Sequence, residues 1–221
     1  MVTELDRRGL AVAAALSAVA GWVDAVAFLA IGGYFVSFMS GNTTRGAVDA
    51  TTGGPWWLAL VLLAGFVSGV AAAGVVQRLV PRRAGTAALS LVTALLLAAA
   101  SAAALDLPVL VVGTLLAAGM GAVNVVFARD HAVSFGVTYM TGALVKATQG
   151  VVGAAWGERD TGWARYLLLW GAIAVGAVAG AAVSAGVGLA ALWAAVVATS
   201  VLLVGSALSR PRATSARGGR R

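Results

Sequence analysis

The side chains best able to do chemistry in this sequence lie inside apolar segments. Asp24 stands about 14 residues into the apolar run at residues 10–31. At about 1.5 Å per residue in a helix, that position is close to the middle of a bilayer. A carboxylate there costs about 3 kcal/mol on insertion scales, so it faces a partner or a water-filled cavity. Asp24 is therefore a residue that binds a cation or carries a proton, or else a neutral or paired residue that joins helices.

A second group of candidates combines hydroxyls, an amide and glycine. Ser40, Gly41, Asn42 and Thr43 lie together in one stretch, and Met140 is followed by the related pair Thr141 and Gly142. Glycine permits an unwound turn, and irregular backbone inside a membrane is tolerated only where protein or water satisfies its amides. Such breaks suit a small polar or ionic solute, bound by freed carbonyls or by helix N-termini. A helix–helix contact through small residues is the alternative.

Two basic residues follow these stretches. Arg45 comes after the first and Lys146 after the second. They are candidates for charge pairing, because they could attract an anion or pair with Asp24. Alternatively, their long side chains extend to the lipid headgroups.

The candidate residues occur twice in the chain. The hexapeptide VSFMSG at residues 36–41 recurs as VTYMTG at residues 137–142, 101 positions later. GWVD at residues 21–24 recurs as GAVN at residues 121–124, so Asn124 matches Asp24 without its charge, and Arg45 aligns with Lys146. Two blocks in the same order at nearly the same offset indicate a gene duplication. We place repeat 1 at about residues 9–105 and repeat 2 at about residues 107–208.

The composition predicts that lipid surrounds these repeats. Hydrophobic residues make up 61% of the 221 positions and charged residues only 10%, whereas soluble domains carry roughly 25% charged residues. We therefore predict an all-α integral membrane protein, with a single membrane domain at residues 1–208 and a basic, disordered cytoplasmic tail at residues 209–221. Its eight apolar segments are expected at residues 10–31, 34–50, 56–80, 84–105, 107–127, 132–156, 163–184 and 186–208.

The arginines predict how many segments cross the membrane. Segments 34–50 and 132–156 are too polar for simple lipid-facing helices. If both dip in and return, the arginine-rich loops and the tail all face the cytoplasm, as the positive-inside rule requires. Eight crossings would place Arg78, Arg82, Arg83 and Arg129 outside the cell. Seven crossings would place the arginine-rich tail outside. We predict six transmembrane helices plus two broken or re-entrant segments in an inverted repeat, with both termini cytoplasmic. Ordinary tilted helices inside a bundle are the alternative.

The recurring motifs also resemble a known family. Residues 21–25, Gly33, Phe35 with Val36, and residues 39–43 are similar to the YoaK-like family of bacterial membrane proteins, also known as domain of unknown function 1275. The second half agrees at residues 121–124 and 138–142, and the similarity covers roughly residues 9–208. Ser40 stands where the family usually has threonine. The resemblance implies a bacterial inner-membrane protein with about six helices and no established activity.

We expect a small secondary transporter or channel for a small polar or ionic solute, with its site between the two broken segments. The alternative is a non-transporting membrane scaffold or accessory protein, which the small-residue pairs Gly65/Gly69 and Gly176/Gly180 would suit. No enzyme activity, catalytic residue, metal or cofactor is expected, because the single histidine, His131, lies at a predicted membrane edge and cysteine is absent. The expected partners are the lipid bilayer and the solute, with a homo-oligomer left open. The net charge of +7 reflects cytoplasmic loops, so we expect no nucleic acid.

Overall fold

The computed structural model describes residues 5–129, 132–133, 136–158 and 162–208. The predicted tail at residues 209–221 and His131 lie outside these ranges. The described residues form eight α-helices, two 3-10 turns and one pair of antiparallel β-strands of two residues each. They are α1 (Arg7–Ala30), α2 (Met39–Thr52), α3 (Trp57–Leu79), η2 (Pro81–Arg83), α4 (Ala84–Ala104), α5 (Val109–Val123), β1 (Ala128–Arg129), β2 (Ala132–Val133), α6 (Met140–Ala155), α7 (Trp163–Val187), η3 (Gly188–Ala191) and α8 (Leu192–Leu208).

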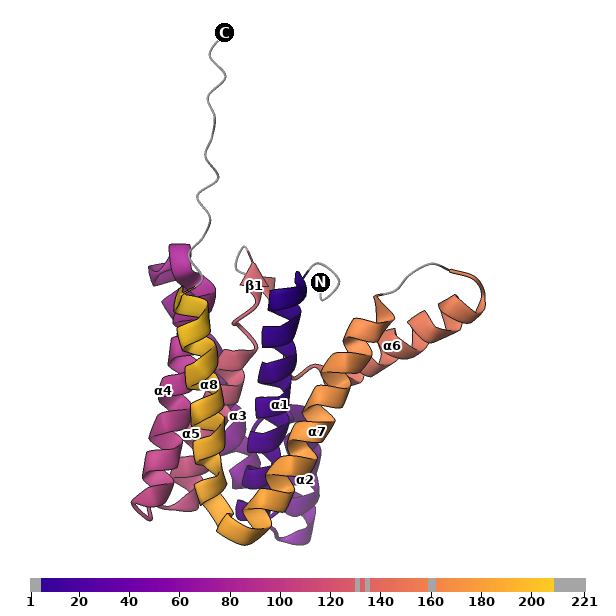
Figure 1. The fold of residues 1–221 in the computed structure, drawn as a ribbon. Coiled ribbons are helices and arrows are strands. Elements are labelled where there is room, and N and C mark those ends of the chain that lie inside the picture. The colour runs from indigo at the N-terminus through magenta and orange to yellow at the C-terminus, as the bar shows by residue number, and fades with distance from the viewer. Residues whose placement is uncertain (1–4, 130–131, 134–135, 159–161, 209–221) are drawn as a thin grey trace.

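The chain is an all-α membrane protein, as the composition predicts. Within the described residues, four stretches are long and apolar enough to cross a membrane, at Arg7–Ala30, Trp57–Leu79, Pro81–Ala104 and Trp163–Leu208, and α5 is a shorter apolar helix. The last stretch contains α7 and α8, between which the chain reverses at η3 (Figure 1). Large apolar side chains such as Val67, Val175 and Val201 are exposed on the outside of the bundle, where lipid would cover them.

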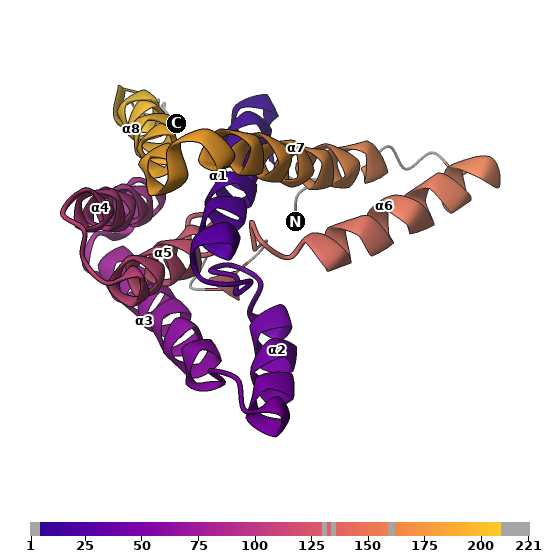
Figure 2. The ribbon, with the colours of Figure 1, turned by 90° about the horizontal axis from the view of Figure 1, so that it is seen from below.

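A bundle is formed by α1, α3, α4, α5, α7 and α8. The helices α2 and α6, called the two short helices below, stand at its side (Figures 1 and 2). α1 packs along α7, α3 packs along α5, and α4 packs against both α5 and α8. Leu16, Leu62, Leu89 and Leu116 belong to the main buried cluster between these helices. The main helix contact of α2 is with α3, and that of α6 is with α7. Both short helices therefore begin close to the bundle and extend away from it.

Glycines bring the crossing helices into backbone contact. A Cβ atom at Gly69 of α3 would overlap the carbonyl oxygen of Ala118 in α5, and one at Gly176 of α7 would overlap that of Ala18 in α1. A Cβ atom at Gly180 would lie 2.7 Å from the carbonyl oxygen of Trp22. These glycines are therefore packing positions, because only a residue without a side chain permits such a close approach of two helices.

The positions of the helix breaks differ from the prediction. Gly41 and Gly142 were expected to unwind the backbone, but both lie in the first turn of a helix, α2 and α6 respectively. The irregular backbone precedes them, and before α2 it contains Gly32 and Gly33 with positive φ values of 69° and 86°. Gly41 is needed for space, since a Cβ atom there would collide with the ring of Phe38. Gly142 has open space around it.

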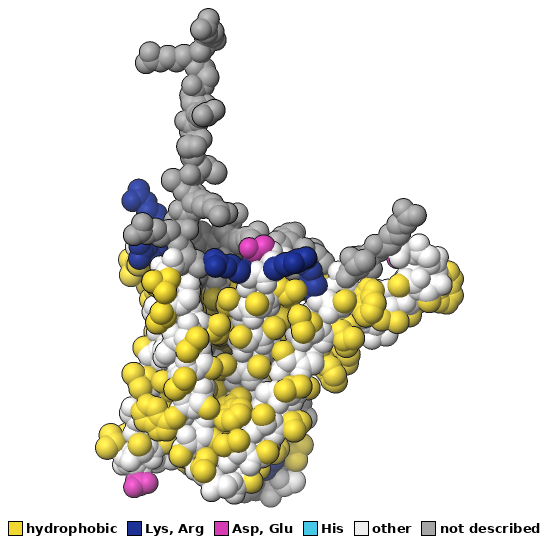
Figure 3. Space-filling view, in the orientation of Figure 1, with side chains coloured by type: hydrophobic (Ala, Val, Ile, Leu, Met, Phe, Trp, Pro, Cys, Tyr) yellow, Lys and Arg dark blue, Asp and Glu magenta, His cyan; other side chains and the backbone are white. Residues whose placement is uncertain are grey.

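The two ends of the bundle differ in charge. α1 begins and α8 ends at the same end, and most Lys and Arg side chains visible in Figure 3 gather there. The turn between α4 and α5 and the reversal at η3 lie at the opposite end (Figure 1). Asp6 caps the N-terminus of α1 at the basic end, where its carboxylate accepts the Gly9 amide at 2.8 Å. This distribution matches the asymmetry that orients helices in membranes.

Candidate solute-binding cavity

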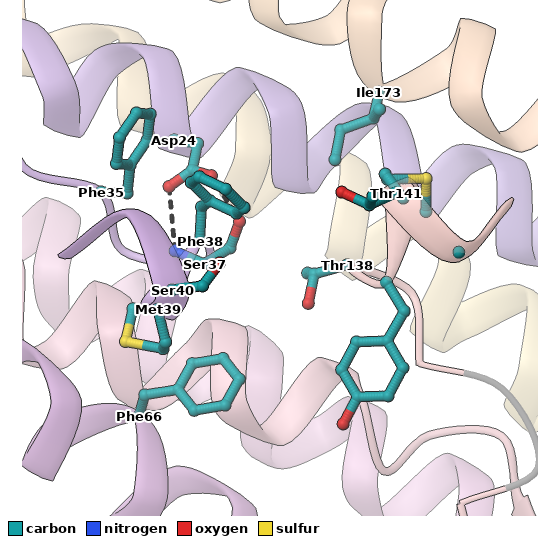
Figure 4. Close-up of a pocket in the computed structure, with 13 residues that line it drawn as sticks. Asp24, Phe35, Ser37, Phe38, Met39, Ser40, Phe66, Thr138, Thr141 and Ile173 are labelled. Atoms are coloured by element: carbon teal, nitrogen blue, oxygen red, sulfur yellow. Dashed lines mark hydrogen bonds between the residues drawn. The ribbon is translucent and has the colours of Figure 1, made fainter. Parts of the chain in front are cut away.

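A cavity of about 630 Å³ lies between the starts of α2 and α6 (Figure 4). α1, α3 and α7 contribute Asp24, Phe66 and Ile173 to its walls. The remaining lining residues come from the two breaks and the helix starts that follow them: Phe35, Ser37, Phe38, Met39, Ser40, Thr138, Tyr139, Met140, Thr141 and Gly142. Four predicted site residues therefore share one cavity: Asp24, Ser40, Thr141 and Gly142.

Asp24 connects α1 to the break before α2. Its Oδ1 accepts the backbone amide of Val36 at 2.7 Å and that of Ser37 at 2.9 Å, and its Oδ2 accepts the Ser37 hydroxyl. Figure 4 shows Asp24 beside Ser37 at the edge of the cavity. Two amides and one hydroxyl therefore converge on one carboxyl group, and both of its oxygens accept hydrogen bonds. The carboxylate both holds the loop and borders the cavity.

Asn124 makes the corresponding connection in the second half. Its Oδ1 accepts the backbone amide of Thr138 at 3.0 Å and the Thr138 hydroxyl at 3.1 Å. Its Nδ2 donates to the carbonyl of Met120 at 2.8 Å. Asn124 is buried and does not line the cavity, so it positions Thr138, which does.

Asn42 is a positioning residue as well. Its side chain is only 1% exposed, and its amide pairs with the backbone of Phe35 in both directions. Oδ1 accepts the Phe35 amide at 2.8 Å, and Nδ2 donates to the Phe35 carbonyl at 2.6 Å. Thr43 is exposed and its hydroxyl donates to Met39 within the helix, so it lies outside the cavity.

Replacing Asn42 with aspartate should destabilise the break before α2. The variant keeps an acceptor for the Phe35 amide but loses the donor to the Phe35 carbonyl, and an unsatisfied buried group costs about 1–3 kcal/mol. Thermal unfolding of the purified protein should show a lower Tm, by about 2–4 °C for each kcal/mol in a chain of this size. Thr43→Ala, on the exposed face of the same helix, is the control with little change. Equal Tm values for the two variants would contradict this role of Asn42.

Arg45 pairs with Asp49 instead of with Asp24. Its Nε lies 3.2 Å from Asp49, and its guanidinium is 5.1 Å from the centre of the Tyr34 ring. Asp49 is 7% exposed and also accepts the Tyr34 hydroxyl, which lies 3.2 Å from the carbonyl of Pro55. This cluster fastens α2 to the loops on either side of it. The spacing of Arg45 and Asp49 by four residues on one helix is the sequence signal for this pair.

Lys146 also lies away from the cavity. Its Nζ is 5.2 Å from the centre of the Tyr166 ring on α7, so it forms a cation–π contact there. The predicted charge-pairing candidates therefore hold α2 and α6 and do not face the cavity.

The aromatic part of the lining was not predicted from the sequence. Phe35 lies between two other rings, with its centre 4.9 Å from Phe28 and 5.4 Å from Phe38. Tyr139 lines the other side of the cavity. The available signal was the duplication itself, because Phe38 and Tyr139 occupy equivalent positions of the repeated hexapeptide.

The fold and the cavity define an α-helical integral membrane protein with a partly polar site beside its helix bundle. The chain belongs to the family described as protein of unknown function, DUF1275, whose model matches residues 12–205. It is 40% identical over 205 residues to the UPF0700 transmembrane protein RA0705 of Rhizobium meliloti (strain 1021), covering 92% of this chain and 88% of that protein. No solved structure matches the chain. The family predicted from the recurring motifs is confirmed.

Proposed function

We propose that the protein is a small secondary transporter or channel for a small polar or ionic solute. Its site is the cavity between α2 and α6, and Asp24 is the residue that selects the solute or couples its movement. The observation that carries the proposal is this cavity, which a carboxylate and several hydroxyls line although it borders membrane-spanning helices. Polar groups inside a bilayer are costly in free energy, so they mark a solute pathway more often than a packing contact. A scaffold would have no need of such a cavity.

The pairing of contacts supports an internal two-fold relation between the halves. The contact of Gly69 with Ala118 has a counterpart in the contact of Gly176 with Ala18. The bonds from Ser37 to Asp24 likewise have a counterpart in those from Thr138 to Asn124. The two glycine contacts join one half to the other, whereas each set of hydrogen bonds lies within one half. Short helices that start at a shared midplane site are typical of transporters built from repeats.

The direction of the helices supports an inverted repeat with six crossings. α1 starts at the basic end of the bundle, whereas its counterpart α5 starts at the opposite end (Figures 1 and 3). With α2 and α6 counted as re-entrant, the spanning helices of the described chain are α1, α3, α4, α5, α7 and α8. Since arginine-rich ends face the cytoplasm, this topology puts both termini inside and suits a bacterial inner membrane.

Single cysteines test whether the cavity is a water-accessible pathway. The native chain has no cysteine, so Ser40→Cys and Thr141→Cys can be labelled without background. We expect a membrane-impermeant thiol reagent to modify both, because both positions line the same cavity. Right-side-out and inside-out vesicles then show from which side the reagent enters, and a transporter should be labelled from both.

A blocking variant and a control position sharpen this test. Gly142 borders the cavity with nothing within 4 Å of where a Cβ atom would lie, so Gly142→Leu should fill the space and suppress labelling at both cysteines. Ser68→Cys, on the exposed face of α3, should stay unlabelled because lipid surrounds it. If both cavity cysteines are inert in folded protein, the transport proposal fails and a scaffold role takes its place.

A further inference from the structure

The described side chains that line the cavity include an acidic residue but no basic one. Asp24 is the one carboxylate among the described residues that line it, and no lysine, arginine or histidine belongs to that lining. The nearby basic residues of the short helices are engaged elsewhere, Arg45 with Asp49 and Lys146 with Tyr166. A solute that enters this cavity therefore meets a carboxylate with no basic side chain beside it.

The rest of the lining has the chemistry that favours organic cations. Phe35, Phe38, Phe66 and Tyr139 present aromatic rings, and Met39 and Met140 add thioethers. Aromatic faces attract cations through the ring quadrupole, by roughly 2 kcal/mol once water is removed. An inorganic cation would instead need several oxygen ligands in a compact shell. The mixture of rings, thioethers and one carboxylate suits an ammonium group with carbon substituents.

The helix starts act in the opposite direction. The N-termini of α2 and α6 both adjoin the cavity, and each carries the equivalent of about half a positive charge. Their effect is largest for an anion that reaches the free amides directly, and a basic side chain would strengthen it. Here the aromatic rings of Phe38 and Tyr139 directly precede the two helices and line the cavity themselves. The carboxyl group and the rings therefore favour a cation over an anion, and an anionic probe tests this preference.

A second hollow continues from the cavity toward the outside of the bundle. It has a volume of about 460 Å³ and shares Asp24, Phe35 and Ile173 with the cavity. Its other lining residues lie on α1 and α7 and are apolar or glycine: Gly21, Ala25, Phe28, Leu29, Trp170, Ala174, Ala177 and Ala181. Phe28, Leu29 and Trp170 are 38%, 56% and 38% exposed, so this groove opens on the surface that faces lipid. Asp24 lies where the polar cavity and the apolar groove meet.

We propose that the solute is an organic cation with an apolar substituent. Its ammonium group lies beside Asp24, among the rings of the cavity, and its apolar part lies in the groove between α1 and α7. This inference rests on the proposed transport function and adds the class of substrate. It also indicates that such a solute can reach the site sideways from the bilayer.

Two alkylammonium probes and one anion test the substrate class. Full-length protein in nanodiscs is titrated with octyltrimethylammonium, butyltrimethylammonium and octanoate, followed by tryptophan fluorescence, because Trp170 lines the groove. Empty nanodiscs give the background from partition into lipid. We expect the octyl cation to bind at least tenfold more tightly than the butyl cation, and octanoate not to bind specifically. If octanoate binds more tightly than the octyl cation, or if the two cations bind equally, the proposal is overturned. Measurements on the wild-type protein are enough for this test.

Two variants then assign the parts of the site. Asp24→Asn should lower the affinity for both cations at least tenfold. Ala174→Leu, which fills the groove, should lower only the difference in affinity between the octyl and the butyl cation. An Asp24→Asn protein that is folded and binds both cations as before contradicts the assignment. If no probe binds but Ser40→Cys and Thr141→Cys are still labelled, the substrate class is wrong and the transport function stands. If the cysteines are inert as well, both proposals fail.

Discussion

Replacing Gly176 with alanine is expected to separate α1 from α7 and to leave little folded protein. The added Cβ atom would overlap the backbone carbonyl of Ala18, which cannot move aside as the end of a side chain can. Overpacking a well-packed interior costs about 1–3 kcal/mol, and more when the backbone must shift. Size-exclusion chromatography in detergent and thermal unfolding should show loss of the monodisperse peak or a Tm lower by several degrees.

The same helix provides a matched control. Gly171 lies in α7 with nothing within 4 Å of where a Cβ atom would lie, so Gly171→Ala should be neutral or slightly stabilising through helix propensity. Gly69→Ala on α3 should lose as much stability as Gly176→Ala, since the carbonyl of Ala118 meets it in the same way. Equal Tm values for Gly176→Ala and Gly171→Ala would show that α1 and α7 are not in backbone contact.

The second large effect is expected from two substitutions of Asp24. Asp24→Ala leaves the amides of Val36 and Ser37 and the Ser37 hydroxyl without their acceptor, at a cost of about 1–3 kcal/mol for each buried group left unsatisfied. Asp24→Asn keeps a carbonyl oxygen in place, and Asn124 already accepts the equivalent donors of Thr138. We therefore expect Asp24→Ala to lower the Tm by several degrees and Asp24→Asn to change it little.

The charge and the geometry of Asp24 are separated in this way. Asp24→Asn should fold normally and yet lose transport, because it removes the carboxylate from the cavity. Counterflow of a labelled alkylammonium ion in proteoliposomes measures transport, and the Tm is the control for folding. A large loss of stability in Asp24→Asn would mean that the charge itself holds the break before α2.

The fold was largely predictable because its signals are local. Long apolar runs without charged residues mark where the long helices lie. The 3-10 turn η3 delays the start of α8 from residue 186 to Leu192. At the two polar segments the helices start at Met39 and Met140 and not at residues 34 and 132. There the side chains of Asp24 and Asn124, more than a helical turn away in sequence, determine the backbone. Such long-range bonds leave no periodic pattern.

The candidate site was predictable only in part. The repeated motif located Asp24, Ser40, Thr141 and Gly142, which line the cavity. It could not separate them from Asn42 and Asn124, because lining and positioning residues have the same polar types and the same spacing. The pairing of Arg45 with Asp49 was not among the alternatives considered for Arg45, although the two residues stand four positions apart on one helix. The rings of Phe35 and Phe66 come from separate elements, and only the fold unites them.

The glycine contacts also bear on how such a chain could have arisen. Each of these close approaches joins residues on opposite sides of position 106, Gly69 to Ala118 and Gly176 to Ala18. Neither half therefore covers its own backbone groove, and each depends on the other for its tightest packing. If both halves descend from one unit, as we propose, that unit had to meet a copy of itself inserted in the opposite orientation. The ancestor would then have been a dual-topology dimer, and fusion made permanent a partnership that already existed.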